Sequence, residues 1–108
     1  MAEQPFIKSV MRQTNFHVVL IVFEVHLPFS QSLKEKRMNL RRLKDKLSQR
    51  FNLAVAEVGH QDSWQRAQIA CSSLSCDRKL LQQLRDQVEN LVLENLDGEL
   101  IYCELEWL

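Results

Sequence analysis

The order in which two hydrophobic periodicities follow one another is the feature that most constrains the fold of this chain. Four segments alternate apolar and polar residues as β-strands do, and two segments repeat apolar residues at helical spacing. The strand-like segments are 17–27, 53–58, 64–74 and 100–108, and the helix-like segments are 32–51 and the stretch after Asp77. This order predicts an α+β, ferredoxin-like βαββαβ domain, with a four-stranded antiparallel sheet and two helices on one face.

The first strand shows the alternation most clearly. One face begins apolar at Val18 and turns polar at Glu24 and His26, which is typical of a strand whose reverse side is only partly covered. The opposite face is wholly apolar and is predicted to turn inward: Val19, Ile21, Phe23, Val25 and Leu27.

Local signals place the ends of the helices. Ser32, followed three residues later by Glu35, forms a capping box for the first helix, and Asp77 is a suitable N-cap for the second. Turn-forming residues 59–63 predict a hairpin between the second and third strands. The apolar stripes predicted to meet the sheet are Leu33, Leu40, Leu43, Leu47 and Phe51, and Leu80, Leu81, Leu84, Val88, Leu91 and Val92.

A chain of 108 residues is expected to form one domain, which we assign to residues 17–108. Residues 1–16 form an N-terminal extension that is either a short helix or a flexible tail. The longest apolar run, 18–23, is too short to span a bilayer, and no secretory signal precedes it. With three cysteines, an odd number, these features predict reduced thiols and a cytoplasmic protein without a membrane segment.

The formal charge is zero, but the charges are segregated along the chain. Residues 34–50 hold eight of the fourteen bases and only two acids, whereas the chain from Asp86 onward holds seven acids and no base. A helix with such a surplus is expected to contact an anionic partner, such as RNA or the ribosome. The candidate phosphate contacts are Lys34, Arg37, Arg41, Arg42, Lys44 and Lys46.

Two other interpretations of the basic helix stay open. The bases surround the helix, so they would not all meet one phosphate backbone, and the surface is then either a solvated face or a site for an acidic protein. Lys36, Arg37 and Lys44 border the apolar stripe, and we expect their stems to cover the sheet while their charged groups reach water.

The uncovered face of the sheet is the second candidate surface. Carboxylates outnumber bases on it, which disfavours stacking of single-stranded RNA there and favours protein contact, including a homodimer. The candidate interface residues are Val18, Leu20, Glu57, Trp64, Arg66 and Tyr102.

Catalytic and metal-binding patterns are weak. His60 and Asp62, with His26, could be acid/base groups or metal ligands, but we interpret His60 as a solvated side chain and Asp62 as a capping or turn residue. The cysteines lack metal-ligand spacing. They are expected to be small buried hydrophobes, and Trp64 and Trp107 to be packing residues. A hydrolase with this fold would require a glycine-rich, anion-binding loop before the first helix, but residues 28–32 contain no glycine. We therefore predict a non-enzymatic protein without metal or cofactor.

Three motifs carry a resemblance to a known family. They are SLKEKR at 32–37, FN-x-x-VAEV at 51–58 and QD-x-WQRA at 61–67. The chain from about Val18 to Val92 resembles the bacterial YlxP-like family, small domains of unknown function. The resemblance implies a ferredoxin-like fold and, because genes of this family tend to sit beside translation-initiation and ribosome-maturation factors, a ribosome-associated or RNA-related accessory role.

The chain departs from the family pattern at two places, and no catalytic residue is carried over, since the family has none agreed. Gly59 stands where family members usually have an acidic residue. The segment before Val18 is longer than usual, and Met11 is an alternative start.

Overall fold

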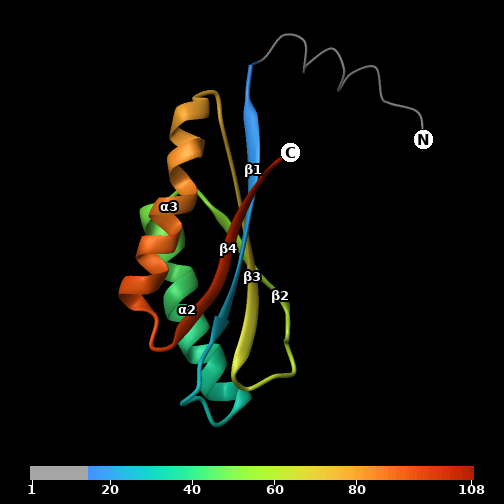
Figure 1. Cartoon of the computed structure of the whole chain (residues 1–108), viewed down its shortest axis with the longest axis vertical. Helices are drawn as coiled ribbons and strands as arrows, with labels where there is room; N and C mark the ends of the chain where they lie inside the picture. Colours follow the sequence, from blue (N-terminus) through green and yellow to red (C-terminus); the bar gives the residue numbers. More distant parts are fainter. Residues whose placement is uncertain (1–14) are drawn as a thin grey trace, which may run out of the picture.

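A computed structural model of the chain describes residues 15–108, and it has the predicted order of elements. They are β1 (His17–His26), α2 (Leu33–Arg50), β2 (Ala54–Gly59), β3 (Arg66–Ser75), α3 (Arg78–Asn95) and β4 (Glu99–Trp107). The strands pair antiparallel in the order β2-β3-β1-β4. Both helices lie on one side of the sheet (Figure 1), so the ferredoxin-like α+β fold is confirmed.

The predicted N-terminal extension, residues 1–16, lies outside the described residues except for its last two. Within the described part of the chain, neither helix combines the length and the apolar composition that crossing a membrane requires.

The core lies between the sheet and the two helices, and β1 runs through its centre. β1 pairs with β3 on one side and with β4 on the other, so both of its edges are hydrogen-bonded. Val19, Ile21, Phe23 and Val25 are fully buried, which confirms the predicted inward face. The helices bury the expected stripes against them, chiefly Leu40, Leu43, Leu47, Leu81, Leu84, Val88, Leu91 and Val92.

The predicted caps form, with one variation. Ser32 Oγ accepts a hydrogen bond from Glu35 N at 3.0 Å, while the Glu35 carboxylate accepts one from Gln31 N rather than from the capping residue itself. Asp77 accepts from two backbone N–H groups in the first turn of α3. The prediction was wrong for Leu80, which is 54% exposed, because α2 ends at Arg50 and leaves that margin of α3 open (Figure 1).

The hairpin between β2 and β3 is longer than predicted. β3 begins at Arg66, so Trp64 lies in the connecting loop rather than in the strand, and its side chain is 55% exposed. The prediction that Trp64 is a packing residue was therefore wrong. Trp107 is half-buried at the end of β4, where the Arg78 guanidinium stacks 3.9 Å from its ring centroid.

Candidate functional site

One lysine of α2 is fully buried and joins the helix to the β2–β3 hairpin. The Nζ atom of Lys36 donates to the backbone oxygens of His60 at 2.9 Å, Arg66 at 3.2 Å and Gln61 at 3.4 Å. The same Nζ lies 3.1 Å from Glu57 Oε2, an ion pair whose angle does not make a hydrogen bond. Four oxygens therefore surround three N–H donors, and the ammonium group is fully used inside the protein.

This arrangement corrects two predictions. Lys36 was expected to send its charged group to water, but its side chain is completely enclosed. Glu57 was expected on the uncovered face, but its register with Ile69 places it on the face that the helices cover. Glu57 is therefore not part of a sheet-face interface, because it faces α2 and binds Lys36.

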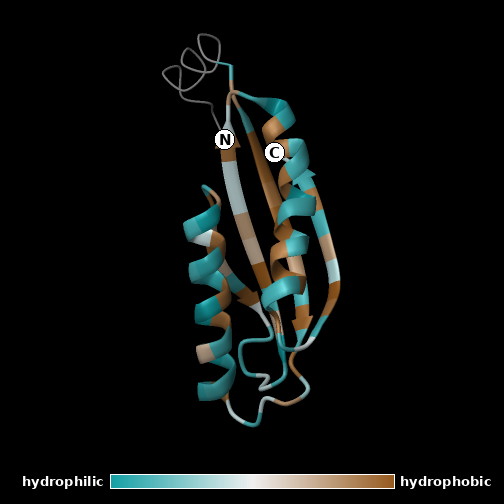
Figure 2. Ribbon diagram, turned by 90° about the vertical axis from the view of Figure 1, so that its left-hand side faces the viewer, coloured by the Kyte–Doolittle hydropathy of each residue, from teal (hydrophilic) through white to brown (hydrophobic). Residues whose placement is uncertain are grey.

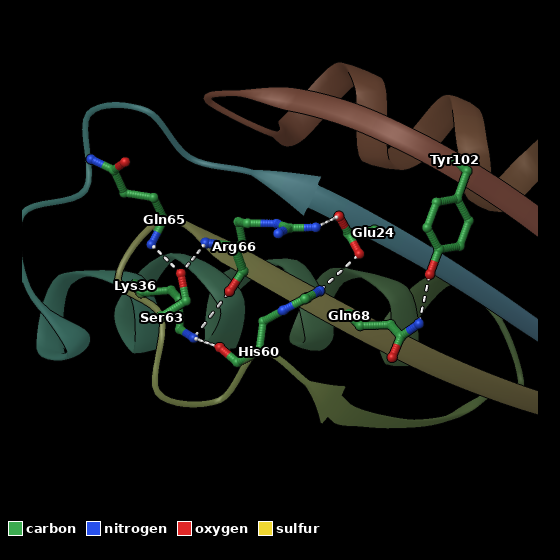
Figure 3. A network of polar contacts seen from close by, with 8 residues as sticks. All are labelled: Glu24, Lys36, His60, Ser63, Gln65, Arg66, Gln68 and Tyr102. Carbon is green, nitrogen blue, oxygen red and sulfur yellow. Dashed lines mark hydrogen bonds and ion pairs between the residues drawn. The ribbon is translucent and has the colours of Figure 1, made fainter.

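A second carboxylate, Glu24, is held on the uncovered face by two side chains of the β2–β3 hairpin, those of Arg66 and His60 (Figure 3). Its Oε2 lies 2.7 Å from Arg66 Nη2 and its Oε1 lies 3.0 Å from His60 Nε2, while the residue is only 6% exposed. His60 is exposed, as predicted, although its ring also contacts Glu24. His60 adopts a left-handed backbone with φ 58°, a conformation that the loop imposes on a non-glycine residue.

These contacts make stability depend on acidity. The hydrogen bond from Arg66 lowers the pKa of Glu24 below its ordinary 4.5; burial opposes this, and the His60 contact adds to it. A carboxylate with a lowered folded-state pKa stabilises the fold above its unfolded pKa, and that contribution is lost as the pH falls through the folded value.

In the native protein, the free energy of unfolding should fall as the pH drops below about 5, and we expect Glu24→Gln to make this fall smaller. Urea unfolding at a series of pH values from 7 to 3 measures this slope. Arg66→Gln should change it in the same direction, and Arg50→Gln, at the exposed end of α2, should not. An unaltered acid limb in both Glu24→Gln and Arg66→Gln would contradict the assignment.

The loop before α2 is bound to the loop before β3 through Gln65. Its Nε2 donates to the backbone oxygens of Pro28 at 3.1 Å and Ser30 at 3.2 Å. Its own backbone oxygen accepts from Leu27 N at 2.7 Å. Ser63 Oγ accepts from the backbone N–H groups of Gln65 and Arg66, which fixes the second loop (Figure 3). The two loops are therefore one ordered end of the molecule.

The bases of α2 other than the buried Lys36 fall into two groups. At about 100° per residue, Lys34, Arg37, Arg41 and Lys44 share an arc of about 80°, which we call the basic stripe. Lys46, one of the predicted phosphate contacts, lies on the other side of the helix, where its Nζ reaches Asn95 Oδ1 of α3 at 2.6 Å. Arg42 belongs to that second group. The structure thus brings four of the six predicted bases together and separates two.

The basic stripe lies on the outer flank of the molecule. α2 contacts β2, the edge strand, and its Lys46 side faces α3, so the stripe points away from α3 beyond the β2 edge. In Figure 2 both helices lie in front of the sheet, and the side of α2 turned to the viewer is almost entirely hydrophilic. The opposite edge of the sheet is acidic, since β4 exposes Glu99, Glu104 and Glu106.

The uncovered face divides into a polar half and an apolar half, and the apolar half is bordered on β4 by Glu104 and Glu106. Val18 and Leu20 lie in the apolar half, where Leu20 and the alanines of β2 line a shallow depression of about 230 Å³. In the polar half, Gln68 Nε2 donates to Tyr102 Oη at 2.6 Å, beside Arg66 and Glu24. Of the predicted interface residues, the structure places Val18, Leu20, Arg66 and Tyr102 on this face.

The described residues contain no group of three or more His, Cys, Asp or Glu side chains placed to hold a metal ion. Two of the three cysteines are buried, as predicted, and Cys76 is exposed. Burial raises the pKa of the Cys71 thiol to about 12 and that of the Cys103 thiol to about 11.

Sequence reasoning missed Phe29, which is 73% exposed in the loop before α2. It was treated only as part of a strand-breaking segment, and no periodicity applies in a loop to reveal its exposure. Its neighbour Ser30 is 2% exposed, so the loop itself is packed while the phenyl ring is not.

Comparison with known proteins gives a family but no activity. Residues 18–105 match the family described as "Protein of unknown function (DUF503)". A curated relative, the uncharacterized protein YlxP of Bacillus subtilis (strain 168), is 40% identical over 47 residues, which are 44% of this chain and 51% of the relative. The match thus spans about half the length of that relative.

Proposed function

Because the chain belongs to the DUF503 family, whose function is unknown, we propose a function from its own geometry: it is a non-enzymatic accessory protein that binds RNA, including ribosomal RNA, through the basic stripe of α2. The single observation that carries this proposal is the alignment of Lys34, Arg37, Arg41 and Lys44 on one outer flank. Such a row is suited to one phosphate backbone.

The dimensions and charges of the stripe support this partner. From Lys34 to Lys44 the helix rises about 15 Å, so several successive phosphates can meet the row. Lys and Arg neutralise phosphates and release counterions, which gives affinity without sequence specificity. The acidic edge on β4 lies across the sheet from the stripe, so the overall neutrality of the chain does not cancel the local positive potential.

The salt dependence of binding tests the proposal. We expect fluorescence anisotropy of a labelled ribosomal RNA fragment to show affinity that falls steeply with salt. Changing Arg37, Arg41 and Lys44 to Gln should remove about two from the slope of log affinity against log salt, since each single-strand phosphate contact contributes about 0.7.

The matched control changes Arg42, Lys46 and Arg50 to Gln, which removes the same charge from the same helix on its other side. This control should keep most of the slope. Equal losses in the two triple variants would show that only net charge matters, and absence of binding at low salt would reject the RNA proposal.

A second candidate, self-association, is favoured by the apolar half of the uncovered face. Symmetric edge-to-edge pairing is disfavoured, because two β2 edges would bring two basic stripes together and two β4 edges would bring like carboxylates together. The apolar face, with Val18, Leu20 and Val22, is then the surface left for a second copy of the chain.

Sedimentation velocity tests this candidate. A dimer held by the apolar half should persist in high salt and dissociate in Leu20→Glu, while Glu104→Gln on the same face should leave it intact. A monomer at all concentrations would reject self-association without bearing on RNA binding.

A further inference from the structure

We infer that the RNA bound by this protein is single-stranded, and that Phe29 and Trp64 are the rings on which unpaired bases stack. This inference rests on the proposed RNA-binding function and names its substrate class. Two exposed aromatic rings at the end of the molecule where the basic stripe begins are its starting observation.

Phe29 and Trp64 emerge from loops that are bound to each other. The Gln65 side chain, next to Trp64, donates to the backbone oxygens on both sides of Phe29, at Pro28 and Ser30. Ser30 N in turn donates to Leu27 O at 3.1 Å, and Leu27 N to Gln65 O. The hydrogen bonds use the polar groups of the loops internally, so both rings are presented on a fixed backbone and lose little conformational freedom on binding.

The exposure of the rings has no structural explanation in the fold. Phe29 is 73% exposed and Trp64 55%, although aromatic side chains bury large apolar areas wherever a core is available. Trp107, the other tryptophan, is half-buried under Arg78. A pair of exposed rings in one ordered end therefore marks a contact surface.

Bases flank this surface, and most nearby carboxylates are already engaged. Lys34 and Arg37 lie in the first turns of α2, directly after the Phe29 loop (Figure 1). Glu24 binds Arg66 and His60, Glu57 binds Lys36, and Glu35 accepts from Gln31 N, while Asp62 remains exposed in the hairpin loop.

Rings beside a row of bases suit a single strand. Aromatic side chains stack on unpaired bases of any sequence, while cationic side chains contact the phosphate backbone. A duplex keeps its bases stacked inside and exposes no base face on which these rings could stack. The polar half of the sheet face, with Glu24 enclosed by its own partners, is not needed for this contact.

Fluorescence titration with a 12-nucleotide RNA of mixed sequence, alone and annealed to its complement, tests the inference. In Trp107→Phe, Trp64 is the only tryptophan, and the single strand should quench its emission while the duplex should not. By anisotropy on the otherwise native chain, Phe29→Ala and Trp64→Ala should each weaken single-strand binding about 5- to 150-fold, with the salt slope unchanged.

Phe16→Ala is the matched control, because Phe16 is an exposed ring at the start of β1, and it should bind like the wild type. Circular dichroism checks that each variant folds. Unchanged Trp64 emission together with equal affinity of wild type and ring variants would overturn the inference and leave the rings to a protein partner, while the salt slope would still support the basic stripe. If the salt slope of binding were absent as well, the proposed RNA-binding function would also be rejected.

Discussion

Replacing Lys36 by Met is expected to lower the free energy of unfolding by about 3–5 kcal/mol, the loss typical of removing one partner of a buried ion pair. Small domains are stable by only about 5–15 kcal/mol, so this single change removes a large share of the total. Urea unfolding monitored by circular dichroism measures the difference.

The size of the effect follows from what Lys36 leaves behind. Without the ammonium group, Glu57 Oε2 remains buried beside α2 with neither an ion-pair partner nor a hydrogen-bond partner, and the backbone oxygens of His60 and Arg66 lose the Lys36 donor. Each buried polar group without a partner destabilises the fold by about 1–3 kcal/mol. The thioether of Met fills a similar volume, so the loss is electrostatic rather than a cavity.

Two variants separate this explanation from a general effect of charge. Lys34→Met removes an exposed lysine from the same helix and should change stability by less than about 0.5 kcal/mol. Adding Glu57→Leu to Lys36→Met should recover part of the loss, because the uncompensated carboxylate is then gone. A loss of under 1 kcal/mol for Lys36→Met would show that the hairpin does not depend on this lysine.

The sequence pattern predicted the sheet and the helices because each is a local property. The alternation in β1 and the caps at Ser32 and Asp77 lie within short windows, so their periodicity or spacing is sufficient. The hairpin loop was misplaced by two residues, since the alternation continues through Trp64 although the backbone pairing begins at Arg66.

The buried ion pair was missed although both partners interrupt apolar patterns. Lys36 stands at the 3-4-3-4 spacing of the stripe that continues at Leu40 and Leu43, where an apolar residue is expected. Glu57 stands in register with the inward Val55 of β2. Each looks like an exception by itself. Only the packing of α2 on β2 shows that the two exceptions neutralise each other, and sequence spacing does not provide that packing.

The Glu24 cluster was missed for the same reason, because its members come from β1, the hairpin loop and β3. The basic stripe could have been predicted from the sequence, since its four bases recur with heptad-like spacing from Lys34 to Lys44. What the sequence did not provide is which side of α2 faces α3.

The second large effect concerns the thiols, and we expect a single cysteine to react rapidly in the native protein. Cys76 is exposed between β3 and α3, while Cys71 and Cys103 are enclosed in the core. With a pKa of about 12, only about one Cys71 thiol in 10,000 is ionised at pH 8, and for Cys103 with a pKa of about 11 the fraction is about one in 1,000. Because the thiolate is the nucleophile and an ordinary thiol with a pKa of about 8.5 is about one-quarter ionised at pH 8, the buried pair should react at least about 100-fold more slowly than such a thiol.

An aromatic disulfide reagent at pH 8 measures this as one fast equivalent per chain, which Cys76→Ser should abolish, and as three equivalents in denaturant. Two fast equivalents in the folded protein would contradict the enclosed positions of Cys71 and Cys103. The slow phase also reports the role of Lys36. If labelling of the core thiols requires unfolding, its rate follows the unfolding equilibrium, so Lys36→Met should accelerate it about 150- to 4,000-fold while Lys34→Met leaves it nearly unchanged.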